Sequence, residues 1–313
     1  MPSTGIPLSE TAEPADPRTL LTHHTLDATA RAWLDEAVSR VTDRPAAIRT
    51  LFPAARRHCG RTRLAGHLTV DEAARAVLLA ALPLGGQALA DELAGLFRHG
   101  DPAEQRAVLR ALYLFSDPQG GDTAREPLDD LALPLVREAL RGNDSSLIEA
   151  ALGPYGAARL PDAEYRQAVL KCVFHEIPLD RITGLSARAD AELARMLADF
   201  AHERVAAGRD VPIDIWPVVR TFPAAGRLTD RLTTETRAAA PDRREAAERA
   251  LQALRPATAS TASTAPTASA ASAASAQNTA SAQCTTLRIQ PASLTEQPEE
   301  KACPCVSSTP TST

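Results

Sequence analysis

The sequence has 313 residues, a formal net charge of −5 and only 4% aromatic residues. Alanine, leucine, arginine and glutamate are abundant, and they favour helices, whereas strands favour β-branched and aromatic residues. No apolar run reaches about 18 residues, so we expect no membrane span. The mild acidity argues against a general nucleic-acid binder. Five scattered cysteines are too few for a disulfide scaffold, and the first residues lack the apolar region of a secretory signal. Composition therefore predicts a soluble, cytoplasmic and mostly helical protein.

The chain is predicted to divide into three parts. Residues 1–18 form a polar lead, residues 19–255 carry helical patterns throughout, and residues 256–313 form a tail. Between positions 256 and 283 every residue is Ala, Ser, Thr, Pro, Gln or Asn. This segment has no large apolar side chain whose burial could offset the entropy lost on ordering. We therefore expect a disordered lead, one all-helical domain and a disordered C-terminal tail.

In the first half of the domain, apolar residues recur at helical spacing and start signals stand before them. Thr69 and Glu72 match a capping box, and Asp101, Pro102 and Glu104 combine a cap, a first-turn proline and an acidic third position. The predicted helices cover residues 23–41, 45–52, 69–82, 86–98 and 101–115.

The second half continues the same pattern without a convincing strand. Its predicted helices cover residues 128–141, 145–152, 161–175, 186–208, 212–219 and 229–254, the last broken at Pro241. Short turns between helices predict antiparallel neighbours, and no tetratricopeptide or ankyrin period appears. The expected fold is all-α: an irregular stack of helical hairpins, either a HEAT-like solenoid or a multi-helix bundle.

Motifs for metal or nucleotide chemistry are missing from the sequence. It has no metalloprotease HExxH, no phosphate-binding glycine loop and no GxSxG. Cys303 and Cys305, separated by Pro304, could hold a soft metal, but they lie in the tail without further ligands. We therefore predict no metal site and no cofactor.

The predicted helix 186–208 has two faces that differ in character. Arg188, His202 and Arg209 project with other charged residues to one side, where contact with solvent is the simpler interpretation. Arg204 falls within the apolar stripe, so its guanidinium needs an acceptor. Two interpretations remain open: an internal ion pair with Glu176 or Asp180, or an anchor for a carboxylate or phosphate ligand.

Lys171 is the only lysine of the predicted helical domain. It lies one helical turn after Gln167, on the flank of the apolar face of its helix. A lysine suits a base, a Schiff base or a phosphate contact. An ordinary surface position is the simpler alternative.

The block 164–212 also carries a distinctive series of short motifs. It contains R-Q-A-V-L-K at 166–171, G-L at 184–185, R-A-D at 188–190, E-L-A-R-M-L at 192–197 and A-H-E-R-V-A-A-G-R at 201–209. These segments resemble the late signature of the EboA domain family, from bacterial ebo gene clusters. With weaker similarity upstream, at residues 101–105 and 141–143, the resemblance spans about 20–255.

Several positions depart from the family pattern, so the resemblance implies a divergent member. The family has asparagine where Arg166 and Asp190 stand, and tryptophan where Val205 stands. Its Asn-Pro-Tyr-Pro segment appears as residues 153–156, Gly-Pro-Tyr-Gly. If these asparagines contact a ligand, ligand binding is expected to be altered or lost.

The resemblance implies a cytoplasmic accessory protein of an ebo-type pathway. Such a protein would serve biosynthesis or precursor export of a cyclitol-like, prenylated secondary metabolite, with pathway enzymes or a small anionic or polyol metabolite as partners and no nucleic acid. Two alternatives stay open: a helical-repeat scaffold without a ligand, and an enzyme that uses Lys171 or the His202–Glu203 pair as acid and base. No catalytic residue is assigned. The candidate ligand-binding residues are Gln167, Lys171, Arg188, Asp190, His202, Glu203, Arg204 and Arg209.

Overall fold

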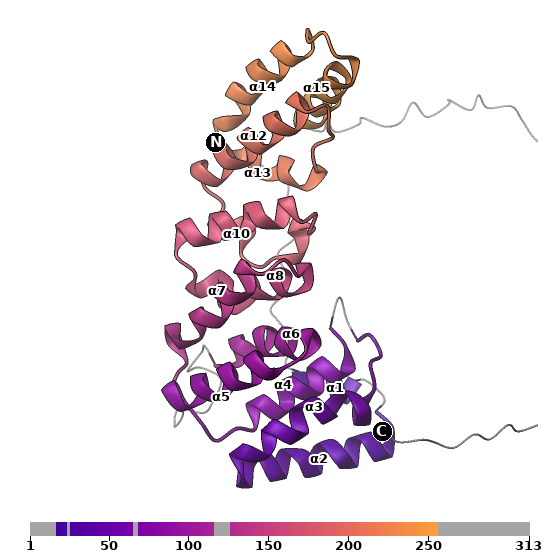
Figure 1. The fold of residues 1–313 in the computed structure, drawn as a ribbon, viewed down its shortest axis with the longest axis vertical. Coiled ribbons are helices and arrows are strands. Elements are labelled where there is room, and N and C mark those ends of the chain that lie inside the picture. Colours follow the sequence, from indigo (N-terminus) through magenta and orange to yellow (C-terminus); the bar gives the residue numbers. More distant parts are fainter. Residues whose placement is uncertain (1–16, 24–25, 65–67, 116–125, 256–313) are drawn as a thin grey trace, which may run out of the picture. The chain divides into compact units, whose positions relative to one another are not determined.

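Helices form every regular element that the structure describes. The computed structural model describes residues 17–23, 26–64, 68–115 and 126–255, and within them no strand occurs, only an isolated bridge between Arg63 and Thr69 (Figure 1). The all-α prediction is therefore confirmed. The tail expected to be disordered, the Cys303–Cys305 motif and nearly all of the expected lead lie outside the described residues.

The longer helices occur in this order along the chain. They are α1 (Pro17–His23), α2 (Ala28–Asp43), α3 (Ile48–Cys59), α4 (Val70–Ala80), α5 (Gly86–His99), α6 (Pro102–Ala111), α7 (Leu133–Arg141) and α8 (Ser145–Ala151), then α9 (Pro154–Arg159), α10 (Asp162–Phe174), α11 (Leu185–Arg188), α12 (Ala191–Ala206), α13 (Trp216–Thr221), α14 (Ala224–Glu235) and α15 (Pro241–Leu254). Short 3-10 turns stand before or after some of them, at 45–47, 112–115, 129–132, 179–181 and 213–215.

Helices that are close in sequence pack against one another. The packing runs from α2 to α3, α4, α6 and α8, and then to α10 and α12, while α13, α14 and α15 gather around α12 (Figure 1). This is an irregular stack of helical hairpins of the expected kind. Helix α4 lies inside it, covered by α1, α2, α3 and α6, and every residue from Val70 to Leu79 is buried.

The predicted start signals correspond to real helix starts. Glu72 closes the capping box of α4 on the Thr69 amide, and Asp101 and Glu104 do the same for α6. The break at Pro241 is also confirmed, because α14 ends at Glu235 and α15 begins at that proline.

Several predictions of helix extent are wrong. The segment 186–208 is two helices, because the backbone of Asp190 is extended and its carboxylate accepts a hydrogen bond from the Leu193 amide, which starts α12 afresh. Similarly, Asp27 caps α2, which therefore begins at Ala28 and not at residue 23. The short helices α1 and α9 were not predicted, since too few residues show a periodicity in them.

A buried ion cluster joins the helices around α4. The side chains of Asp71, Glu72 and Arg75 are at most 2% exposed. Arg75 donates to Asp71 at 2.6 Å and to the Phe52 carbonyl oxygen at 3.1 Å, while Glu72 accepts from Arg106 and Arg110 of α6. These contacts satisfy the buried charges and tie α4 to α3 and α6.

Among the residues that the structure describes, no helix combines the length and the apolar composition needed to cross a bilayer.

Candidate functional site

Gln167 and Lys171 face a groove between α7 and α10. Its volume is about 530 Å³. Its apolar wall comes from Leu140, Ala163 and Ala168.

Lys171 is held in place at the edge of this groove. Its ammonium group donates to the carbonyl oxygens of Leu140 at 2.5 Å and Gly142 at 2.6 Å. These carbonyls lie at the C-terminal end of α7, where backbone acceptors have no partner within the helix and a cation is favourable. Two of the three ammonium protons are thereby used, and the side chain has a defined position.

The groove carries more positive than negative charge. Arg137 and Glu164 form a two-pronged ion pair at 2.7 and 2.8 Å, and this pair lowers the pKa of the Glu164 carboxyl. Arg141 is exposed, and its guanidinium has no ion-pair partner among the described residues. Three basic side chains therefore line the groove with one carboxylate, which Arg137 already neutralises. Such a surface attracts an anion.

Arg188 does not face the groove. Its guanidinium donates to the carbonyl oxygens of Ala157 at 2.6 Å and Leu160 at 2.7 Å, and to Asp162 at 2.7 Å. It also lies over the Tyr165 ring, 4.2 Å from the ring centroid. These contacts hold the end of α9 against the start of α10, so Arg188 is a structural residue here.

Asp190 and Arg166, two of the departures from the family pattern, bind each other. Their closest oxygen and nitrogen atoms are 2.6 Å apart, and the ion pair lowers the pKa of the Asp190 carboxyl. Asp190 also caps α12 through the Leu193 amide at 2.9 Å. The two replacements therefore act together, as a link between α10 and the start of α12.

His202 contacts α14, so the simpler interpretation, contact with solvent, is wrong for this residue. Arg231 donates to Nδ1 at 2.8 Å, and Nε2 lies 3.2 Å from the Glu235 carboxylate. Because a guanidinium can only donate, Nδ1 must be the acceptor and Nε2 carries the proton. The imidazole is thus oriented by two neighbours on α14.

The remaining candidates, in α12 and directly after it, do not line the groove. Arg204 donates to the Asp210 carbonyl oxygen at 2.8 Å, and this backbone acceptor takes the place of the expected Glu176 or Asp180. Glu203 and Arg209 are exposed. Of the eight candidate residues, the structure therefore brings only Gln167 and Lys171 to one groove.

Comparison with known families identifies the chain. The family described as the metabolite traffic protein EboA matches residues 54–220, which is more than half of the sequence. The chain belongs to the EboA family. Neither the curated proteins nor the solved structures gave a match.

The EboA match contains the groove and all eight candidate residues. Arg137 and Arg141, which line the groove from α7, were not among the candidates. No motif distinguishes them from the many other arginines of the sequence, and only the fold, which brings α7 beside α10, gives them a common groove with Lys171.

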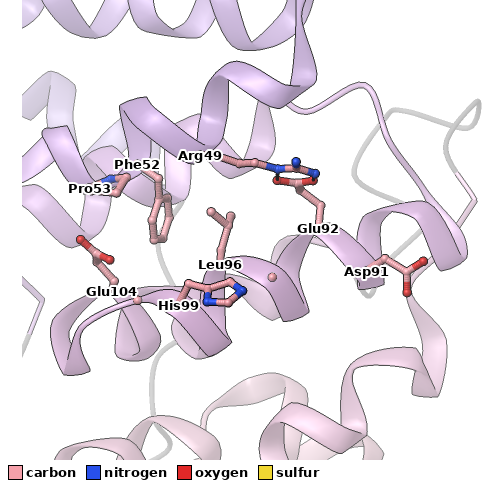
Figure 2. Close-up of a pocket in the computed structure, with 10 residues that line it drawn as sticks. Arg49, Phe52, Pro53, Asp91, Glu92, Leu96, His99 and Glu104 are labelled. Atoms are coloured by element: carbon pink, nitrogen blue, oxygen red, sulfur yellow. Dashed lines mark hydrogen bonds and ion pairs between the residues drawn. The ribbon is translucent and has the colours of Figure 1, made fainter.

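A second cavity of this EboA protein escaped sequence reasoning altogether. It has a volume of about 370 Å³ and lies between α3, α5 and α6 (Figure 2). Its lining residues are Arg49, Phe52, Pro53, Asp91, Glu92, Gly95, Leu96, His99, Gly100 and Glu104. One feature of the sequence could have indicated this cavity: Gly95 is a glycine in the middle of a strongly periodic helix.

Proposed function

We propose that this protein is an accessory protein that binds a small anionic metabolite in the groove between α7 and α10. The observation that carries the proposal is the charge of the groove, where Arg141 and Lys171 have no carboxylate bound to them among the described residues. The description of the family as a metabolite traffic protein supports the same role.

The groove offers separate contacts for a charged group and for hydroxyl groups. Arg141 can bind a carboxylate or phosphate with its planar fork, and the remaining proton of Lys171 adds a point charge. The Gln167 amide can both donate to and accept from a hydroxyl group. A volume of about 530 Å³ lies within the usual range of ligand pockets. A polyol that carries one anionic group suits this set.

We place this binding step in an ebo-type pathway of the cytoplasm, as the family resemblance implies. A scaffold without a ligand is the main alternative, and it is favoured by the internal contacts of Arg188, Asp190 and Arg204. Those contacts lie outside the groove. The enzyme alternative gains little support, because Lys171 acts as a donor to two carbonyls and His202 is held by Arg231 and Glu235.

Calorimetric titration tests the proposal with myo-inositol 1-phosphate as the anionic probe and myo-inositol as the neutral control. We expect the phosphate to bind more tightly, and Arg141→Gln to weaken its binding by about tenfold, as the loss of a charge-assisted hydrogen bond requires. Arg57→Gln, at an exposed arginine of α3, is the matched control and should bind like the parent.

The scaffold alternative makes the opposite prediction for the same titrations. Absence of saturable binding of the phosphate, or equal binding by the parent and Arg141→Gln, would overturn the proposed site. Gln167→Leu provides a second test. This variant should bind the phosphorylated polyol more weakly than the parent does, whereas its affinity for inorganic phosphate should be unchanged.

A further inference from the structure

The cavity between α3, α5 and α6 has an apolar wall and polar ends. Phe52 of α3 and Leu96 of α5 point into the space between their helices, with Pro53 beside them (Figure 2). Glu104 lies at one end, and the Arg49–Glu92 pair lies at the other (Figure 2). A ligand with an apolar body and a polar end would match this arrangement.

The carboxylate of Glu104 is incompletely neutralised. Its nearest cation is Arg75, whose Nη2 is 3.8 Å from Glu104 Oε1, but Arg75 also binds Asp71 at 2.6 Å. One buried guanidinium thus serves two carboxylates. The Asp101 amide donates to the other oxygen of Glu104 at 3.2 Å, and the Glu104 side chain is 12% exposed. Negative charge therefore remains at this end of the cavity.

The opposite end supplies no free cation. Arg49 binds Glu92 through two hydrogen bonds, at 2.9 and 2.7 Å. Glu92 is 11% exposed and Arg49 is 68% exposed, so this ion pair lies at the solvent side of the cavity. Asp91, which points away from the centre, adds further negative charge (Figure 2). The cavity as a whole disfavours an anion.

Gly95 leaves one wall of the cavity open. It lies within α5, where glycine weakens a helix relative to alanine. A Cβ atom at this position would meet no atom within 4 Å. Packing therefore does not require glycine here, and the space that it leaves belongs to the cavity.

We propose that this cavity is a second binding site, which takes a small organic cation such as a primary amine. The ammonium group binds Glu104, and the apolar body lies against Phe52 and Leu96. The site is independent of the groove between α7 and α10, and its charge preference is the opposite one.

The test is a titration with phenethylamine, followed by protein-observed NMR, against phenethyl alcohol and phenylacetate. We expect saturable binding of the amine, about tenfold tighter than that of the alcohol, because only the amine forms a charge-assisted hydrogen bond. Glu104→Gln should remove most of this preference. Glutamine preserves the third position of the α6 capping box, so the helix start is retained.

Gly95→Leu should fill the cavity and abolish amine binding. Gly226→Leu is the matched control, because Gly226 of α14 also has open space around it but lies outside the cavity. Arg141→Gln should leave amine binding unchanged, which separates this site from the groove. Equal binding of amine and alcohol, unchanged binding by Gly95→Leu, or no saturable binding of the amine would each overturn the proposal.

Discussion

Charged side chains form networks in two regions of the protein, and the networks differ in burial. Around α4, the side chains of Asp71, Glu72 and Arg75 are at most 2% exposed. On α12, Arg195 and Asp199 are 48% and 40% exposed, although they form ion pairs of the same length, 2.6 Å.

This difference in burial decides what each network contributes. Removal of one partner from a buried pair leaves a charge without water or counter-ion, whereas water replaces the lost partner of an exposed pair. Short distances alone therefore do not identify the interactions on which stability depends. Four substitutions test this comparison.

The largest effect is expected for Arg75→Met. It leaves Asp71 buried without its cation, and we expect a loss of about 3–5 kcal/mol in the free energy of unfolding. Urea denaturation followed by circular dichroism measures the loss. The double variant Arg75→Met/Asp71→Asn should recover part of it, because the buried charge at position 71 is then removed as well. A loss below about 1 kcal/mol in the single variant would contradict the role assigned to burial.

Glu235→Gln should have an intermediate effect. The Glu235 side chain is 7% exposed and binds Arg243 and His202, so we expect a loss of about 2 kcal/mol near neutral pH. Arg243 is the main cause that lowers the pKa of Glu235 from its usual value of 4.5.

The pH dependence of that effect follows from the sign of the shift. A carboxyl whose pKa is lowered in the folded state stabilises the fold fully at a pH above its usual pKa. This stabilisation is lost as the pH falls through the pKa of the folded state. Urea denaturation between pH 7 and pH 3 should therefore show a weaker loss with acid in Glu235→Gln than in the parent. If the free energy of unfolding of the parent and of Glu235→Gln changes with pH in parallel, the assigned role of the Glu235 carboxylate is contradicted.

Asp190→Ala should have a smaller effect, of about 1 kcal/mol, because the α12 cap is lost. Asp190→Asn is the control, since asparagine caps helices about as well as aspartate. Thermal unfolding distinguishes the two variants. If both lose the same stability, the ion pair with Arg166 matters more than the cap.

The smallest effect is expected for Arg195→Gln. Its partners Glu192 and Asp199 are exposed and become hydrated when the arginine is removed. We expect an unfolding midpoint equal to that of the parent within experimental scatter, in low and in high salt. A clear loss at low salt that disappears at high salt would show that the exposed network does stabilise the fold.

The sequence predicted where several helices begin, but it did not predict which helices pack against one another. The capping boxes at Thr69 and Asp101 depend on residues three positions apart, so they could be recognised without a structure. The burial of Arg75 could not, because it depends on the helices that cover α4. Asp190 shows an intermediate case: its cap is local, but the helical pattern on both sides concealed it.

The spacing of two candidate residues could be interpreted without a structure. Gln167 and Lys171 share a helix flank, which follows from their spacing, and both line the groove between α7 and α10. The partners of Lys171 are carbonyl groups of α7, about thirty residues away. The hydrogen-bond acceptors of Arg188, His202 and Arg204 lie outside α11 and α12. A helical projection of these two helices could therefore not identify them.

The sequence by itself determined the all-helical class, most helix starts and the relationship to the EboA family. These features depend on residues close together along the chain, where propensity, capping and motif spacing act. Only the tertiary structure decided which charges are buried, which face a groove and which cavity remains open beside Gly95. Those properties arise between segments distant in sequence, because desolvation and ion pairing depend on the side chains that packing brings together.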